Sequence, residues 1–410
     1  MELYNFIKNN QIRDIETLKT SLEVSPYNLK IKHDTTYENL FLIHNQDNSD
    51  TSLKIVRECN GLIIERFPEN GTFRIICYTF DKSTENNEIN ENLNLSNLYC
   101  ENSIEGTLLK LFYYGDKWNI ATKKCIDASK ARWVSKKNYS ELFMECIVNI
   151  PTFFDSLNKN NCYAFILTHP ENKIYVNYQL PALYHISTRN LETMTEIEEI
   201  ILGIEKTAKY PINYPIENNE TKTSLTQEDF VNLVQKIKND TTNIFYEGFI
   251  LIDTNYNRHK VKTNLFLRAK EIWGNTNHRF FRYLDLRRDE NLLNEYLTYF
   301  PYDKELFVKY ELNIHELAKK ILDVYMEEHV IKNKNKIPFY LKKIIYAIHG
   351  DFLKDRIKTN LNKIMVYVLK MDVKQICFIM NQIEKDRTKE NKTEENMIVN
   401  DMINEVEMDM

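Results

Sequence analysis

The chain has 410 residues and a formal net charge of −5, and 43% of its residues are hydrophobic. This length predicts two domains, no run approaches the ~20 apolar residues of a membrane-spanning helix, and the first residues do not resemble a signal peptide. The seven cysteines are scattered without CxxC pairs. They argue against a zinc site or a disulfide framework and favour a cytoplasmic protein with reduced thiols.

The first part of the chain shows helical and then strand-like patterns. Residues 1–38 are polar and are predicted to form an extension that is helical in part, including Ile15 to Leu22. Ile63-Ile64 and Phe249-Ile250-Leu251-Ile252 read as β-strands because β-branched and aromatic residues favour a pleated, half-buried surface. We therefore expect residues 39–300 to form an α+β domain of antiparallel strands, with insertions at 83–99 and 205–227.

A hairpin and a short helix are predicted inside this domain. Gly115-Asp116 form a two-residue turn that needs positive φ, which makes residues 107–123 a hairpin. Trp133, Tyr139 and Phe143 indicate a short amphipathic helix between Arg132 and Phe143.

Downstream, apolar residues recur at helical spacing. We expect an all-helical C-terminal domain at 303–388, with Pro338 just inside a helix start and a packed helix break at His349 to Phe352. Residues 390–410 contain seven acidic residues and one lysine. They predict a disordered acidic tail that competes with polyanions for basic surfaces.

Glu247-Gly248-Phe249 followed by Lys260-Val261-Lys262 is the most informative pattern for function. Residues two apart in a strand face the same side, so Lys260 and Lys262 project together. Two ammonium groups on one face favour an anion between them, and phosphate is the usual one. An exposed edge strand that carries lysines against aggregation is the alternative.

Five segments in order make the chain resemble the RNA ligases of the phage T4 RNA ligase 1 type and related RNA-ligase-like proteins of large DNA viruses. These segments are Arg57 to Ile64, Ser103 to Leu108, Phe165 to Tyr178, Glu247-Gly248 and Lys260 to Lys262. The resemblance covers about residues 40 to 300. It implies a nucleotidyltransferase domain with an ATP-grasp-like ligase fold, ATP and Mg²⁺ as cofactors, and RNA ends as partners.

The resemblance also implies a defect in the first chemical step. In the family a lysine attacks ATP, and Ser103 stands in its place here; a serine is a nucleophile only beside a general base. Glu105 replaces the aspartate of this motif and Gly106 is retained. Asn60 replaces an arginine, and Ile166 replaces a glutamate. Glu105, Gly106, Glu247, Lys260 and Lys262 are the expected nucleotide-binding residues, with Glu247 holding the metal through waters.

Lys124 is a candidate surrogate for the missing lysine. Pairing Tyr114 with Lys117 sets Thr107 opposite Lys124, and side chains directly opposite share a face. Lys124 would then face the pocket, whereas Lys110 and Lys123 would face away. The alternative is a solvated lysine that contacts RNA backbone.

Two basic stretches coincide with the motif strands. Residues 110–137 carry eight lysines and arginines against two acids, and residues 258–288 carry nine against two. With Tyr113, Tyr114, Trp118 and Trp133 interleaved, they predict an RNA groove with stacking platforms.

Three functions are consistent with these patterns. The favoured one is an RNA-ligase-like protein that binds RNA ends or a nucleotide but does not adenylylate itself. The others are an active ATP-dependent RNA ligase that uses a non-standard lysine, and a structural partner protein with a vestigial pocket.

Overall fold

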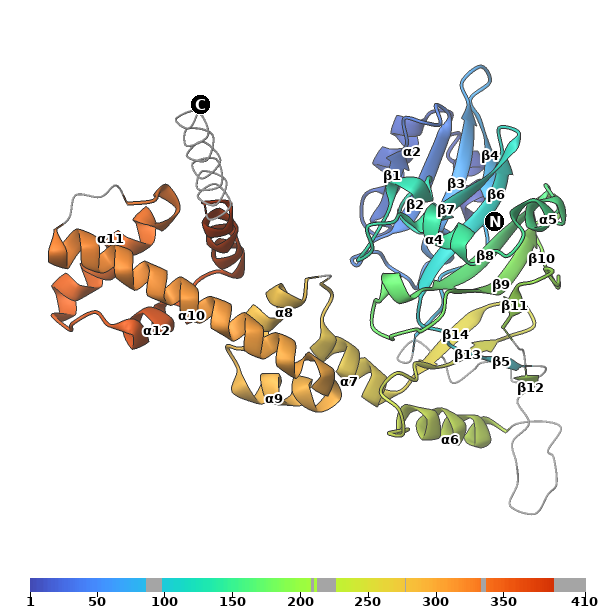
Figure 1. Ribbon diagram of the computed structural model, residues 1–410. Helices are drawn as coiled ribbons and strands as arrows, with labels where there is room; N and C mark the ends of the chain where they lie inside the picture. The colour runs from blue at the N-terminus through green and yellow to red at the C-terminus, as the bar shows by residue number, and fades with distance from the viewer. Residues whose placement is uncertain (86–97, 208–209, 212–225, 277, 333–336, 387–410) are drawn as a thin grey trace, which may run out of the picture. The chain divides into compact units, whose positions relative to one another are not determined.

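The computed structural model describes residues 1–85, 98–207, 210–211, 226–276, 278–332 and 337–386 (Figure 1). It divides into two compact units, Met1–Glu271 and Ile272–Met410. The first is built mainly on antiparallel sheets and the second on helices, so the α+β class with a helical C-terminal region is confirmed. The acidic tail and most of the two predicted insertions lie outside the described residues.

The first sheet has four antiparallel strands in the order β1-β2-β3-β4, with helices packed against it. Helix α2 begins at Ile15 as predicted, because the Asp14 side chain accepts a hydrogen bond from the backbone N–H of Thr17. Residues 29–33, expected in the polar extension, instead form a strand because Leu29 and Ile31 bury one face. The elements are α1 (Glu2–Asn9), α2 (Ile15–Leu22), β1 (Leu29–His33), β2 (Leu40–Asn45), α3 (Lys54–Glu58), β3 (Asn60–Phe67) and β4 (Thr72–Cys77).

The second sheet has the order β10-β9-β8-β6-β7, and β11 pairs with β9 in parallel. The predicted hairpin is confirmed: Tyr114 pairs with Lys117, and Gly115 and Asp116 have φ values of +59° and +58°. Its strands are β6 (Thr107–Tyr114), β7 (Lys117–Thr122), β8 (Asn161–Thr168), β9 (Ala182–Asn190), β10 (Glu196–Ile197) and β11 (Glu205–Lys206).

Two short helices lie between β7 and β8. They are α4 (Tyr139–Glu145) and α5 (Ile150–Asp155). The prediction of a helix from Arg132 is wrong at its start. Asn138 and Glu141 form a capping box that begins α4 at Tyr139, which leaves Trp133 in the preceding loop.

The third sheet has the order β12-β5-β13-β14. Its strands are β5 (Tyr99–Asn102), β12 (Tyr210–Pro211), β13 (Gly248–Ile252) and β14 (Arg258–Lys262), and helix α6 (Gln227–Lys238) packs on it through Phe230 and Val234. The strand predicted at Phe249 to Ile252 is therefore confirmed.

The helical unit begins upstream of the boundary we expected near residue 300. Stacked and tilted ring contacts tie α8 and α9 to α10, and they are formed by Tyr283, Tyr296, Phe300 and Phe307. The elements are α7 (Asn264–Trp273), which crosses the unit boundary, α8 (Arg279–Leu286), α9 (Glu290–Tyr299), α10 (Lys304–Met326), α11 (Phe339–Asp355) and α12 (Leu361–Lys370).

Two details of this unit differ from expectation. Helix α11 runs unbroken through His349 to Phe352, so the predicted helix break is wrong; glycine in a helix costs only about 1 kcal/mol. Pro338 is the residue before the helix and not its first turn. Among the described residues, none of the helices combines the length and apolarity needed to span a bilayer.

Candidate functional site

The first unit contains a cavity of about 320 Å³ between the second and third sheets. One part of its wall is apolar and is formed by Phe80, Leu108, Ile166, Ile186 and Ile250. The other part is charged and contains Glu85, Glu101, Glu105, Glu247, Lys82, Lys123, Arg258, Lys260, Lys262 and Lys270. A wall with one apolar and one cationic part suits a ligand that carries both a planar base and phosphate groups.

Glu247 lies at the centre of the charged wall. Its side chain is 5% exposed, and its carboxylate oxygens lie 3.7 Å from Lys260 Nζ and 3.8 Å from Lys262 Nζ. Burial alone would raise the pKa of this carboxyl, but Lys260, a hydrogen bond from Ser103 and Lys262 together hold it below its usual value. The structure thus brings together Glu247, Lys260 and Lys262, three of the residues expected at the nucleotide-binding site.

Strand pairing sets this arrangement. Gly248 pairs with Lys262 and Ile250 with Lys260, so both lysines project from the same face of β14. Gly248 has a φ of +124°, and a Cβ there would stand 2.0 Å from the carbonyl oxygen of Val261. Only glycine allows β13 to approach β14 this closely directly after Glu247.

Ser103 is bound to the same strand. Its backbone N–H donates to the carbonyl of Gly248 at 2.9 Å, and its hydroxyl donates to Oε2 of Glu247 at 2.6 Å. Ser103 is buried and is not part of the cavity wall, although its neighbours Asn102 and Ile104 are. The hydroxyl therefore serves as a hydrogen-bond donor to Glu247 in this structure.

Glu105 and Gly106 lie at the cavity where the sequence predicted them. Burial raises the pKa of Glu105 despite Lys270, whose ammonium group is 3.9 Å from the carboxylate. A Cβ on Gly106 would stand 2.6 Å from Cγ2 of Ile166 and 2.7 Å from the carbonyl oxygen of Leu167. Gly106 thus permits close packing between the segment that precedes β6 and strand β8.

The prediction that Lys124 faces the cavity is wrong. Strand β7 ends at Thr122, where the backbone N–H of Thr122 donates to the carbonyl of Cys125 and the chain turns. The prediction assumed that side chains continue to alternate between the two faces of the strand, and this turn interrupts that alternation. Lys124 is exposed, and its neighbour Lys123 lines the cavity instead.

Lys110 faces away from the cavity as predicted, but it is not solvated. Its side chain is 1% exposed, and its ammonium group donates to the carbonyl oxygens of Asn60 and Gly61. A Cβ on Gly61 would stand 2.9 Å from Lys110 Nζ and 2.7 Å from the carbonyl oxygen of Lys123. Lys110 therefore fixes the start of β3 next to the Lys123 segment.

Lys82 is a cavity residue that the sequence did not single out, and the prediction that Lys123 faces away from the cavity is wrong. Burial, together with the positive charges of Lys82, Lys124 and Lys110, lowers the pKa of Lys123 to about 8. Side-chain alternation along a strand does not predict where these two lysines point, because Lys82 comes after the end of β4 and Lys123 comes after the end of β7.

The predicted RNA groove is corrected in part. Lys110 donates to backbone carbonyls and Arg258 is paired with Glu196, so neither buried side chain offers an unpaired charge to RNA. The ring of Trp118 packs against Tyr113, Phe154 and Tyr163, so it belongs to the core and is not a stacking platform. The basic count of the two stretches thus overstates the charge available to a ligand.

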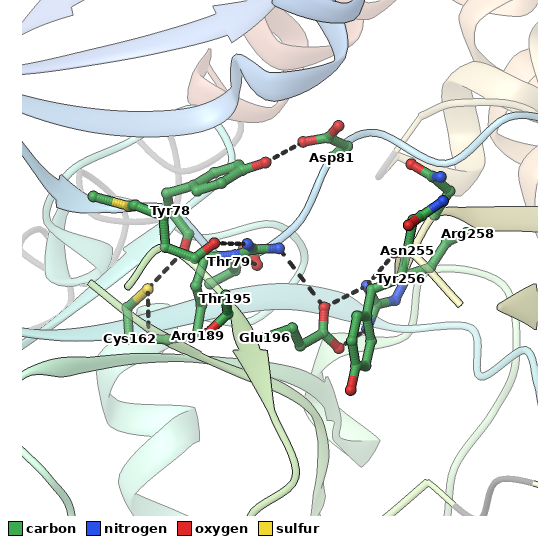
Figure 2. Close-up of polar contacts among 12 residues, drawn as sticks. Tyr78, Thr79, Asp81, Cys162, Arg189, Thr195, Glu196, Asn255, Tyr256 and Arg258 are labelled. Atoms are coloured by element: carbon green, nitrogen blue, oxygen red, sulfur yellow. Dashed lines mark hydrogen bonds and ion pairs between the residues drawn. The ribbon is translucent and has the colours of Figure 1, made fainter. Parts of the chain in front are cut away.

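A buried ion-pair network anchors the strand that carries Lys260 and Lys262 (Figure 2). Glu196 of β10 accepts two hydrogen bonds from Arg258 of β14, at 2.5 and 3.0 Å. Arg189 lies 3.8 Å from the same carboxylate and donates to the carbonyl of Thr79 at 2.7 Å. These bonds join the second and third sheets beside the cavity, so they fix its width.

The residues fit a divalent cation only as a partner of a bound ligand. The described part of the chain contains no group of three or more His, Cys, Asp or Glu side chains that could hold a metal. The Glu247 carboxylate already faces Ser103, Lys260 and Lys262. A cation would therefore take most of its ligands from phosphates and water, with Glu247 contributing through a water molecule.

Comparisons with known proteins agree with an RNA ligase-like chain. No family model matches. The chain is 24% identical over 318 residues to the immediate-early protein ICP-46 homolog of Invertebrate iridescent virus 6, covering 72% of this chain and 66% of that protein. It is 28% identical over 197 residues to the RNA ligase of Rhodothermus phage RM378, covering 41% of this chain and 45% of the ligase.

A solved archaeal ATP-dependent RNA ligase covers 72% of this chain and 71% of its own, at 10% identity and a TM-score of 0.40. At that TM-score the likeness decides neither fold nor function. The sequence similarity makes the chain RNA ligase-like. The chain spans just under two thirds of the iridovirus relative and less than half of the phage ligase.

Proposed function

We propose that the chain is an RNA-ligase-like nucleotidyltransferase-fold protein of the phage T4 RNA ligase 1 type that binds phosphorylated ligands in this cavity. The ligands are a nucleoside triphosphate such as ATP, with Mg²⁺, and the 5′-phosphate of an RNA end. The observation that carries the proposal is Glu247 flanked at 3.7 and 3.8 Å by Lys260 and Lys262 in a cavity of about 320 Å³.

The charged wall supports phosphate binding. Lys260 and Lys262 share the buried Glu247 carboxylate, and Lys262 also pairs with Glu85 at 3.0 Å. Lys82 and Lys123 have no carboxylate within ion-pair distance among the described residues. Lys82 and Lys123 thus add positive charge that no ion pair among the described residues neutralises. Phosphate oxygens satisfy such ammonium groups with strong, charge-assisted hydrogen bonds.

The apolar wall supports a nucleotide in preference to inorganic phosphate. Phe80, Leu108, Ile166, Ile186 and Ile250 provide surface for a base. Ile166 stands where the resemblance expects a glutamate, so the ribose or metal contact of that position is absent. We expect weaker dependence on Mg²⁺ than a glutamate at that position would give.

We further propose that no nucleotide is transferred to Ser103. Its hydroxyl already donates to Glu247, whose pKa is lowered and which is therefore a weak base. Ser103 is also buried and is not among the residues that line the cavity. The chain thus lacks self-adenylylation by the route that the resemblance implies.

Equilibrium binding tests the proposal. The full chain should bind a single-stranded RNA with a 5′-phosphate more tightly than the same RNA with a 5′-hydroxyl, and ATP should compete for the difference. Affinity should fall with salt as neutralised phosphates release counterions. Equal affinity for both ends, with no competition by ATP, contradicts the proposal and favours a structural partner protein with a vestigial pocket.

A further inference from the structure

Lys123 presents an amine to the cavity without a carboxylate to hold its proton. Its side chain lines the same wall as Glu247, Lys260 and Lys262. Within the described residues, no carboxylate lies within ion-pair distance of its ammonium group. Lys260 and Lys262 differ, because both lie within 4 Å of a carboxylate that stabilises their charged form.

The surroundings of Lys123 are cationic. Lys82 lines the same cavity, Lys124 is the next residue, and the buried ammonium group of Lys110 lies next to Gly61, as the backbone of Lys123 does. Burial and these three charges lower the pKa of Lys123 to about 8, and the carboxylate of Asp47 opposes the shift without cancelling it. Roughly a tenth of such amines are neutral at pH 7, whereas an ordinary lysine is almost wholly protonated.

A desolvated lysine beside other cations is a recognised form of activated nucleophile. Lys110 contributes to this state and is itself excluded from the chemistry, because its amine is buried and donates to the carbonyls of Asn60 and Gly61. Lys110 and Lys123 therefore have different roles. Lys110 fixes the Asn60–Gly61 wall and adds charge, and Lys123 reaches the ligand.

We propose that Lys123 is the nucleophile of this cavity and accepts a nucleoside monophosphate from a bound nucleoside triphosphate. The inference rests on the proposed function, since it requires the triphosphate to bind. It moves the acceptor role from Ser103, and from the exposed Lys124, to a residue that lines the cavity.

The step balances with the triphosphate as the only co-reactant. The lone pair of the neutral Lys123 Nζ forms a P–N bond to the α-phosphorus. The bond from this phosphorus to the oxygen that bridges to the β-phosphate breaks, and that oxygen keeps the electron pair. Pyrophosphate leaves, the amine loses one proton to solvent, and Lys123 carries the nucleotide as a phosphoramidate.

Adduct mapping on the unmodified full chain tests this inference. The protein is incubated with α-labelled ATP and Mg²⁺ between pH 6.5 and 9.5, and the labelled peptide is identified by mass spectrometry. We expect one adduct on Lys123 that resists alkali and is released by acid. The rate of its formation should rise with pH with a midpoint near 8.

Two matched variants sharpen the test. Lys123→Arg keeps the positive charge but removes the nucleophilic amine, and it should lower adduct formation at least a hundredfold. Lys124→Arg alters the neighbouring exposed lysine and should leave the rate within about twofold. Adduct on Lys82, Lys124 or Ser103 overturns the inference.

The absence of any adduct overturns the inference as well, and equilibrium binding separates that failure from failure of the proposed function. If ATP still competes with 5′-phosphorylated RNA, the cavity binds its ligand and Lys123 does not react. If ATP does not bind at all, the proposed function and this inference fail together. Neither reading depends on the folding of a variant, because both use the unmodified chain.

Discussion

The hydroxyl of Ser103 donates a 2.6 Å hydrogen bond to Oε2 of Glu247, a residue 144 positions away in the chain. This bond joins the end of β5 to the residue before β13, and both strands belong to the third sheet. It also fixes one oxygen of the carboxylate that Lys260 and Lys262 share. Ser103 therefore helps to position the centre of the charged wall.

A Ser103→Ala variant should lose stability but keep ligand binding. Removing a donor to a buried charged group is expected to lower the free energy of unfolding by about 1–2 kcal/mol, measured by urea unfolding at pH 7. Affinity for 5′-phosphorylated RNA should change less than about threefold, because the hydroxyl does not line the cavity. A nucleotide adduct that is mapped to Ser103 in the wild type and is lost in the folded variant would contradict this account.

A Glu105→Gln variant should change how stability depends on pH. Burial raises the pKa of Glu105 above its unfolded value of 4.5, so its protonated form is favoured by folding. The stability that this group contributes is fully present below about pH 4.5 and is lost as the pH rises through the folded pKa. The neutral glutamine should thus match the wild type at low pH and exceed it at pH 7.

Urea unfolding of both proteins at several pH values measures this difference. The opposite order, with the glutamine variant less stable at pH 7 than at pH 4 relative to the wild type, would mean that Lys270 outweighs burial at Glu105.

Gly248→Ala should open the site. The added Cβ would stand 2.0 Å from the carbonyl oxygen of Val261, so β13 and β14 must separate. We expect a loss of roughly 3 kcal/mol in unfolding free energy, from the clash and the unfavourable φ together. Gly203→Ala is the matched control, because Gly203 also has positive φ (+78°) but a Cβ there meets no atom within 4 Å. Equal losses in the two variants would contradict the role of close strand approach.

Local strand geometry made part of the site predictable. Lys260 and Lys262 alternate within one strand, and Glu247 precedes the strand that pairs with it, so a hairpin alone brings them together. The Lys124 prediction used the same alternation but extended it past Thr122, where a turn hydrogen bond ends the strand. Predictions from side-chain alternation hold only as far as the strand stays hydrogen-bonded to its neighbour.

The remaining features depend on contacts between distant segments. Arg258 and Glu196 are 62 positions apart, and nothing in either sequence neighbourhood marks them as an ion pair. Lys110 has the pattern of a strand residue with an exposed side chain, yet the packing of β3 against β6 buries it. Such pairings follow from how the sheets pack, which composition and periodicity do not encode.

The central claim is that Lys260 and Lys262 bind a terminal phosphate, and the most direct test is the double variant Lys260→Ala/Lys262→Ala. Affinity for a 5′-phosphorylated RNA and for its 5′-hydroxyl counterpart is measured for this variant and for the wild type at the same salt concentration. Lys236→Ala/Lys238→Ala removes the same charge from α6, whose residues do not line the cavity, and is the control.

We predict that the double variant binds the 5′-phosphorylated RNA at least tenfold more weakly, a loss of about 1.4 kcal/mol, and the 5′-hydroxyl RNA less than threefold more weakly. The control should affect both RNAs equally. An equal loss for both RNAs in the Lys260→Ala/Lys262→Ala variant would contradict the account, because the two lysines would then contact RNA backbone and not a terminal phosphate.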